Sequence, residues 1–401
     1  MGTRPWIMLA LGMFAQSAQS VFVNGVAFLI PELRDTHGGS LGNIGLLVAA
    51  PTVGVLVALV AWGAAADRWG ERVVLAAGLT LTALGGLGAA LASSVSLGLV
   101  GVLLFVGGVG AASSNTASGR VVVGWFPADR RGLAMGIRQM SLPLGIAFAA
   151  LTLPPAGAAH GIGWALAIPA AACGIAALAC AVGIVDPPRP AREDAAGAGL
   201  LDNPYRQTRT LVRIHAASAL LVVPQQMVWT FSLVWLLDRR GWDAAAAGLL
   251  ITVTQIGGAL GRMAVGQLSD RMGSRLRPMR GVAVVGCLSV AGLALTDLAG
   301  SSWSVVFLVV ASLATVAPNG LAFTAVAETA GPFLSGRALG LQNTGQFAAA
   351  ALVPPVLGTL IGTVGYPATF ALAAVFPALA TPLVPDDRGS LDRGTTTGTA
   401  S

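Results

Sequence analysis

Three long stretches without a charged residue set the strongest limit on how this chain can fold. Residues 73–119, 139–185 and 338–385 hold 47, 47 and 48 consecutive residues without Asp, Glu, Lys or Arg. A helix needs about 20 apolar residues to cross a bilayer, so each stretch is long enough for two crossings. Of the 401 residues only 10% are charged, against about 25% in soluble domains. The sequence therefore predicts an all-α, polytopic membrane protein.

Turn-forming segments are expected to divide these stretches into pairs of helices. The candidate connections are "ASSVS" at 92–96, "PPAGAAHG" at 154–161 and "GTVGYP" at 362–367. The predicted twelve transmembrane helices lie near residues 6–31, 42–66, 73–93, 97–123, 133–155, 162–185, 211–237, 244–268, 279–299, 303–327, 338–361 and 366–384. The first apolar run continues through residue 30, which favours an uncleaved helix over a signal peptide.

The arginines predict how these spans are oriented. All 23 basic residues are Arg, and with Arg4 inside, seventeen of them fall in inner segments, three in outer segments and three within spans. By the positive-inside rule, both termini are expected to be cytoplasmic in a protein of the plasma membrane. The net charge of +6 then follows from topology, so no nucleic-acid partner is expected; the partners are the lipid bilayer and a small molecule.

One long polar connection, residues 186–209, is interpreted as a cytoplasmic linker. It separates a predicted six-helix bundle at 1–185 from a second at 210–385, and the tail at 386–401 is expected to be disordered. The three cysteines and three histidines are scattered without metal-ligand spacing, so neither a metal nor a cofactor is expected. No catalytic motif is found, which argues against an enzyme. A monomer is expected.

The second half of the chain repeats motifs of the first half. "WGAAADRWGER" at 62–72 aligns with "VGQLSDRMGSR" at 265–275, and "RGLAMGIRQ" at 131–139 aligns with "SGRALGLQN" at 335–343. Asn115 and Asn319 also occupy corresponding positions, because they are separated by nearly the same number of residues as these motifs. The duplication predicts two pseudo-symmetric six-helix bundles with a substrate site at the bilayer midplane between them. Asp67 and Asp270 are each expected to cap the helix that begins next in the sequence.

With these duplicated motifs the chain resembles the major facilitator superfamily of transporters over essentially its whole length. The resemblance implies transport of a small molecule by alternating access. It also implies that the two charged loops form a conformational latch, the alternative being that they only anchor helices at the membrane interface. The latch residues are Asp67, Arg68, Gly70, Arg72, Asp270, Arg271, Gly273 and Arg275.

Polar side chains within the spans mark the expected substrate cavity, because such residues tend to face the interior of a bundle. The candidate substrate-binding residues are Gln16, Gln19, Asn115, Arg138, Gln225, Gln255, Arg262, Asn319 and Gln342. Arg262 lies eight residues before Asp270, about 12 Å into its span. No Asp or Glu occupies the centre of a predicted span, which favours a small organic or inorganic anion as substrate. Arg138 has an alternative role, anchoring its helix near the inner face.

Two departures bear on the choice of substrate. Nitrate porters of this family carry an Arg in the second span where this chain has Leu59, which argues against nitrate itself. The alternative function, proton-coupled drug efflux, is disfavoured because Leu104 replaces the usual span-four Arg and only "LPLG" at 142–145 stands for the antiporter motif. A non-transporting sensor also remains open, and the coupling partner is expected to be a proton or a counter-anion.

Overall fold

The computed structural model describes residues 2–30, 32–33, 41–190, 192–197 and 200–386, and within them all regular secondary structure is helical. The membrane-length helices of the first half are α1 (Arg4–Gly25, continued by η1 at Val26–Leu29), α3 (Leu41–Trp69), α4 (Glu71–Ala92), α5 (Leu97–Trp125), α7 (Ser141–His160) and α8 (Ile162–Gly183). Short helices lie between and after these: η2 (Ala128–Arg130), α6 (Arg131–Arg138), α9 (Arg192–Gly197) and α10 (Pro204–Gln207). The second half contains α11 (Thr210–Asp238), α12 (Ala244–Met272), α13 (Leu276–Leu298), α14 (Trp303–Ala314) and α15 (Pro318–Leu383).

The helical run at Trp303–Leu383 must be more than one crossing. Its 81 residues would extend about 120 Å as one straight helix, roughly four times the thickness of the hydrocarbon core. Gly331 and Gly365 have φ angles of +73° and +81°, which a right-handed helix does not adopt, so the chain turns at both positions. Nine other helices in the described residues are long and apolar enough to span a membrane. The predicted twelve crossings are therefore confirmed.

Several helix boundaries differ from the predictions. The fifth crossing is interrupted after α6 and continues through Pro154 to His160, where Gly161 with φ +84° ends it, instead of ending at residue 155. The helices α3 and α12 run on to Trp69 and Met272, a few residues past their predicted ends. Asp67 and Asp270 consequently lie in the last turn of one helix and not at the start of the next.

Contacts between residues divide the chain into two compact units. Unit 1 comprises Met1–Pro127, Arg138–Asp202 and Gly331–Thr344; unit 2 comprises Ala128–Ile137, Asn203–Ala330 and Gly345–Ser401. Each unit thus includes a short segment from the opposite half of the sequence. The bundles at 1–185 and 210–385, with a linker at 186–209, stay a prediction, and residues 387–401 of the predicted disordered tail lie outside the described residues.

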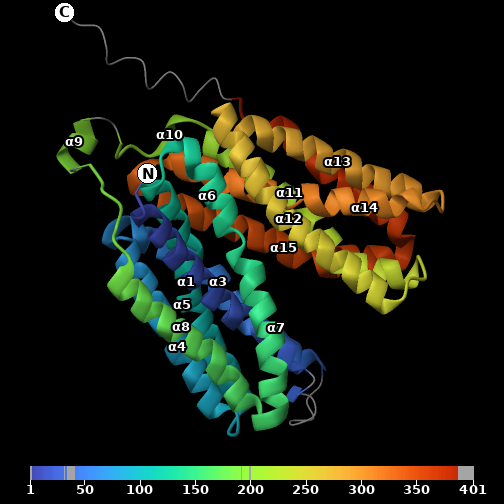
Figure 1. Cartoon of the computed structure of the whole chain (residues 1–401), viewed down its shortest axis with the longest axis horizontal. Coiled ribbons are helices and arrows are strands. Elements are labelled where there is room, and N and C mark those ends of the chain that lie inside the picture. The colour runs from blue at the N-terminus through green and yellow to red at the C-terminus, as the bar shows by residue number, and fades with distance from the viewer. Residues whose placement is uncertain (1, 31, 34–40, 191, 198–199, 387–401) are drawn as a thin grey trace, which may run out of the picture. The chain divides into compact units, whose positions relative to one another are not determined.

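Within unit 1, α5 packs against both α3 and α4, and α8 packs along α4 (Figure 1). Glycines allow the α3 and α5 backbones to touch: a Cβ at Gly54 would lie 2.2 Å from the Phe105 carbonyl oxygen, and one at Gly108 would lie 2.1 Å from that of Pro51. Small residues at helix contacts are characteristic of membrane bundles, where close van der Waals packing holds the helices together.

Unit 2 has an aromatic and aliphatic core near the end of α11. The rings of Trp235 and Phe370 meet edge to face with centroids 6.1 Å apart, and Val290, Leu293 and other buried side chains surround them. This core fixes α11 against α13 and the last part of α15.

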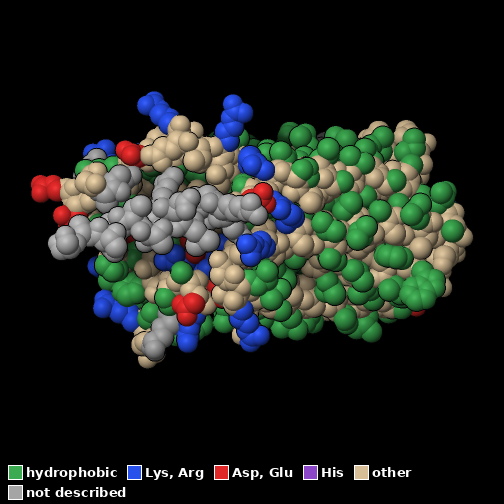
Figure 2. All heavy atoms as spheres, turned by 90° about the horizontal axis from the view of Figure 1, so that it is seen from above, with side chains coloured by type: hydrophobic (Ala, Val, Ile, Leu, Met, Phe, Trp, Pro, Cys, Tyr) green, Lys and Arg blue, Asp and Glu red, His purple; other side chains and the backbone are tan. Residues whose placement is uncertain are grey.

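The exposed surface is largely apolar. Large hydrophobic side chains such as Leu91, Leu151 and Val182 are more than 70% exposed. Figure 2 shows a face on which hydrophobic side chains cover much of the surface. A soluble monomer rarely exposes apolar area on this scale, so these side chains face lipid.

Candidate functional site

Unit 1 contains a buried cluster of polar side chains from α1 and α5. The Gln16 amide nitrogen donates to Asn115 Oδ1 at 3.0 Å and to Gln19 Oε1 at 3.1 Å. The Ser118 hydroxyl donates to Gln16 Oε1 at 3.3 Å. Gln16, Gln19 and Asn115, all predicted from sequence, are thereby brought together. Among the described residues, Asn115 Nδ2 has no hydrogen-bond partner and remains available as a donor.

Arg138 joins this cluster from the end of α6. Its Nε and Nη2 donate to Ser118 Oγ at 3.0 and 2.8 Å, and Nη2 also donates to the Asn115 carbonyl at 3.0 Å. The side chain is buried, with the residue only 4% exposed. The guanidinium therefore lies against the same α5 segment that holds the amide cluster.

Unit 2 contains a buried arginine, Arg262, and a second polar cluster around Asn319. Arg262 Nε donates to the Val316 carbonyl at 3.2 Å, and its guanidinium carbon lies 6.0 Å from the centre of the Trp229 ring. Val316 lies between α14 and α15, where Pro318 lacks the N–H group that would continue the helix. Asn319 donates to Gln225 Oε1 at 3.0 Å.

Gln346 extends the second cluster from α15. The Gln346 amide donates to Ser218 Oγ at 2.6 Å and to Asn319 Oδ1 at 3.4 Å. Gln255 is exposed on α12, and Gln342 is buried in the α15 segment that belongs to unit 1. The nine predicted residues are therefore distributed over both units. Ser118 and Ser218 were missed, since serine is too common in spans to stand out.

The first charged loop joins α3 to a distant part of the chain. Asp67 accepts hydrogen bonds from the backbone N–H groups of Gly336 and Arg337 at 2.8 and 3.0 Å. Arg120 Nη1 lies 2.5 Å from the same carboxylate. The α3 backbone approaches so closely that a Cβ on Gly63 would lie 2.3 Å from the Gly336 carbonyl oxygen.

The second charged loop repeats this arrangement in unit 2. Asp270 accepts hydrogen bonds from the backbone N–H groups of Gly132 and Leu133, both at 2.9 Å, at the start of α6. Arg275 Nη1 lies 2.5 Å from the Asp270 carboxylate. A Cβ on Gly266 would lie 2.2 Å from the Gly132 carbonyl oxygen. The sequence repeat is thus matched by a repeated contact.

The arginines at the two charged loops come from different elements of the fold, but their guanidinium groups contact corresponding carbonyl groups. Arg120 on α5 donates to the carbonyl of Pro332, four residues before Gly336. Arg275, which follows α12, donates to the carbonyl of Ala128, four residues before Gly132. In each copy, one arginine therefore contacts both the aspartate and the backbone segment whose N–H groups the aspartate caps.

The expectation that Asp67 and Asp270 cap the next helix is wrong. At α4 the cap is Asp186, whose Oδ1 accepts from the N–H groups of Glu71 and Arg72 at 2.7 and 2.8 Å. Gly70, with φ +89°, brings the chain so close to Asp186 that a Cβ would lie 2.3 Å from its Oδ2. Asp67 is one turn too early in α3 to reach those N–H groups.

The remaining latch residues have separate contacts. Arg72 Nε donates to the Ala181 carbonyl near the C-terminus of α8 at 2.6 Å, and Arg68 lies over the Trp69 ring at 5.7 Å. Gly273, with φ +58°, ends α12 in the left-handed conformation. Arg271 is exposed in the last turn of α12.

A further carboxylate completes each loop. Glu71, with a fully buried side chain, lies 2.9 Å from Arg120 Nε and 3.1 Å from Arg189 Nη2. In unit 2, Glu328 lies 3.3 Å from both Arg131 and Arg275. Burial alone would lower the pKa of Arg275, but the carboxylates of Glu328 and Asp270 outweigh it and hold this pKa above its usual value. These pairs were missed because sequence does not reveal which distant charges meet.

The described residues contain no group of three His, Cys, Asp or Glu side chains placed to hold a metal ion. The polar clusters of the two units consist of arginine, amide, hydroxyl and backbone groups. Such sites bind by hydrogen bonding and charge.

Comparisons with known proteins identify the family. The family model described as Major Facilitator Superfamily matches residues 8–354. An MFS-type transporter of Mycobacterium tuberculosis, named as uncharacterized, is 48% identical over 380 residues, which cover 95% of this chain and 84% of the relative. The Bacillus subtilis protein named probable galactarate/D-glucarate transporter GudP is 23% identical over 336 residues, covering 75% of this chain and 73% of that protein.

Solved structures share the fold. A crystal structure of the Escherichia coli fucose:proton symporter FucP superposes with a TM-score of 0.74 at 18% identity, covering 95% of this chain and 98% of the other. With a family match over most of its length and a relative 48% identical, the chain belongs to the Major Facilitator Superfamily, as a multi-pass membrane transporter.

Proposed function

We propose that this transporter carries a small organic anion. The observation that carries the proposal is that each unit buries an arginine close to a cluster of amide side chains. Arg138 contacts Ser118 and the Asn115 carbonyl in unit 1, and Arg262 contacts the Val316 carbonyl, three residues before Asn319, in unit 2. Placing an arginine at the centre of a membrane span costs about 2.5–3.5 kcal/mol on insertion scales, so an arginine at such a position is expected to have a function. A guanidinium is well suited to binding a carboxylate, because its N–H groups can donate two parallel hydrogen bonds to the two carboxylate oxygens.

The surrounding groups favour a substrate that carries hydroxyls as well as charge. Gln16, Asn115, Gln225 and Asn319 present amide donors and acceptors, which match alcohols better than hydrocarbon. The distant relative GudP is named for galactarate and D-glucarate, which are hydroxylated dicarboxylates. We therefore place hydroxylated carboxylates first among the candidate substrates. The described contacts of the two clusters include no acidic side chain that would pair with a cationic drug.

The repeated loops would act as the latch of the alternating-access cycle. Each aspartate caps backbone N–H groups of a segment that comes from the opposite half of the sequence, so the contact is made of parts that a rocking motion of the halves would separate. The exposed arginines of these loops agree with a cytoplasmic location in the plasma membrane, with both termini inside. A proton is the proposed coupling ion, with counter-anion exchange as the alternative.

A thermal-shift screen of the purified protein against D-glucarate, simple monocarboxylates and cationic drugs tests the substrate class. We expect hydroxylated carboxylates to raise the unfolding temperature of the native protein and of Arg206→Ala, which removes an exposed linker arginine. The shift should disappear in Arg262→Ala. Stabilisation of every variant by cationic drugs, with none by anions, would refute the proposal and support drug efflux.

Counterflow in proteoliposomes separates a transporter from a sensor. Vesicles preloaded with the stabilising anion should accumulate the labelled anion transiently, and Arg138→Ala and Arg262→Ala should each slow this at least tenfold, the loss expected when a charge-assisted hydrogen-bonded pair worth about 1.5–3 kcal/mol is removed. Binding without any exchange would show that the protein is not a carrier.

A further inference from the structure

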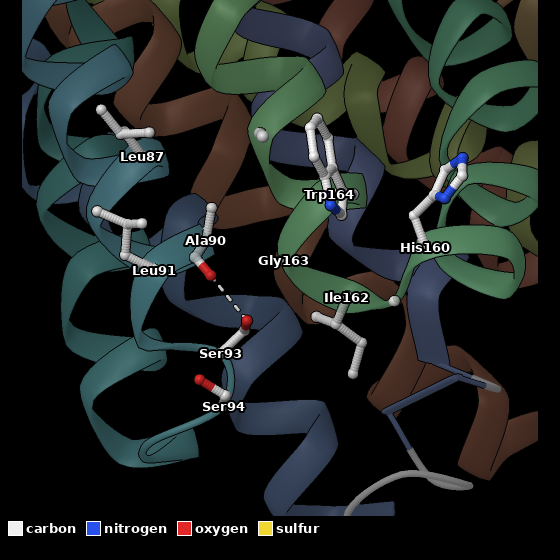
Figure 3. A pocket seen from close by; sticks show the side chains of 11 residues that line it. Leu87, Ala90, Leu91, Ser93, Ser94, His160, Ile162, Gly163 and Trp164 are labelled. Atoms are coloured by element: carbon white, nitrogen blue, oxygen red, sulfur yellow. Dashed lines mark hydrogen bonds between the residues drawn. The ribbon is translucent and has the colours of Figure 1, made fainter.

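A groove opens in unit 1 where the end of α4 meets the start of α8, opposite the latch end of these helices. Its volume is about 740 Å³, in the range of small-molecule sites. In Figure 3, Leu87 and Leu91 of α4 lie on one side of the groove and Trp164 and His160 on the other. None of its lining residues is an arginine or an acidic residue, so the groove differs in chemistry from both polar clusters.

The groove exists because glycines shape the turn between α7 and α8. Gly161 adopts φ +84° and joins the two helices without an intervening loop. A Cβ on Gly163 would lie 2.9 Å from Ser93 Oγ and 3.0 Å from the Ala90 carbonyl oxygen, so a larger residue here would crowd the close approach of α8 to α4. The larger side chains on either side then form walls around a floor of small residues.

The lining changes from polar to apolar along the groove. Ser93, Ser94 and His160 lie at the helix ends, while Leu87 lies seven residues before Ser94, about 10 Å deeper along α4. Trp164, 67% exposed, lies next to His160 with ring centroids 6.2 Å apart. Tryptophan prefers the level of lipid headgroups. The polar end therefore lies at the membrane interface and the apolar end in the hydrocarbon region.

We propose that this groove binds one phospholipid molecule of the surrounding bilayer. The groove is continuous with the lipid-facing surface of the same helices, where Leu84 of α4 and Leu178 of α8 are 62% and 67% exposed. One acyl chain lies against Leu87 and Leu91. The phosphate accepts hydrogen bonds from His160 and Ser94, groups that suit a phosphodiester better than a bare hydrocarbon.

Photocrosslinking of the full-length protein in vesicles tests the proposal. The probe is a phosphatidylglycerol with a diazirine on one acyl chain, and adducts are mapped by peptide mass spectrometry. We expect adducts concentrated at residues 87–94 and 160–167. The variant Ala167→Phe, which fills the apolar end, should lower them at least about fourfold, since burial of even one methylene is worth that factor. The control Ala150→Phe, at an exposed position of α7 that does not line the groove, should leave them unchanged.

A headgroup arm completes the test. His160→Ala should weaken labelling by the phosphatidylglycerol probe but not by a diazirine diacylglycerol, which lacks the phosphate. Trp164→Ala should lower labelling, whereas Trp303→Ala, at an exposed tryptophan of α14, should not. Adducts spread evenly over the lipid-facing helices, or equal labelling in Ala167→Phe and Ala150→Phe, would overturn the proposal and leave the groove as ordinary lipid-exposed surface.

Discussion

At the scale of single residues, Arg120 and Glu71 show how a charge is kept within a mostly apolar chain. The Arg120 side chain is 3% exposed and bridges two carboxylates, Asp67 and Glu71, while it also donates to the Pro332 carbonyl. Arg189 shares Glu71 and reaches the carbonyls at the end of α3. Because every charge here has a counter-charge, removal of one member leaves the others uncompensated.

We predict that Arg120→Leu destabilises the protein strongly. Breaking a buried ion pair by removing one partner costs about 3–5 kcal/mol, because the remaining charge stays buried. Arg68→Ala is the matched control: Arg68 is exposed in the same region, and surface substitutions usually change stability by less than about 0.5 kcal/mol. Thermal unfolding in detergent measures both. Equal unfolding temperatures for the two variants would contradict the described network.

The cap of α4 gives a second prediction at this scale. Asp186→Ala removes the side-chain acceptor for the N–H groups of Glu71 and Arg72, and losing an N-cap costs about 0.5–2 kcal/mol. Asp186→Asn keeps an acceptor and should retain most of the stability. Chemical denaturation of the reconstituted protein compares the two variants.

At the scale of elements, glycines decide where helices touch. The pairs Gly63/Gly336 and Gly132/Gly266 bring backbones together at the two charged loops. By contrast, a Cβ on Gly261 of α12 would meet no neighbouring segment within 4 Å, so this residue is simply a glycine in a helix. Identical residues therefore have different roles that only packing reveals.

We predict opposite effects for alanine at these two kinds of glycine. Gly63→Ala and Gly266→Ala should each lower the counterflow rate and the unfolding temperature, because the added Cβ would lie within 2.3 Å of a carbonyl oxygen. Gly261→Ala should leave transport unchanged and raise stability slightly, since alanine is favoured over glycine in helices by up to about 1 kcal/mol. Loss of transport in all three variants alike would refute the close-contact explanation.

At the scale of the whole molecule, the two charged loops belong to different units but would take part in one transport cycle. Asp67→Asn and Asp270→Asn should therefore have additive effects on unfolding stability, as is usual for sites without shared partners. Their effects on the counterflow rate should be non-additive if both contacts break in the same step. Additive rates in a double-mutant cycle would show that the loops act independently.

The sequence predicted much of this architecture because its signals are local. Charge-free runs specify crossings, and the duplicated motifs indicate two related halves. The amides on α1, α5, α11 and α15 were predicted as a set, and the structure groups several of them. The partners of Asp67, Glu71 and Glu328 were not predictable, since each lies far away in the sequence. Assigning Asp67 and Asp270 as caps of the next helix in the sequence was also wrong, because both cap segments that are distant in the sequence.

The different origins of Arg120 and Arg275 have a consequence for evolution. The carboxylate and the facing glycine occupy corresponding positions in both copies, whereas the cation reaches its carbonyl from α5 in one and from beyond α12 in the other. The position paired with Arg120 by the repeat is Thr324. Across homologues, the aspartate and the facing glycine should therefore be invariant, while the arginine should occur at either of these two alternative positions. A variant carrying Thr324→Arg together with Arg275→Ala should accordingly fold and remain functional.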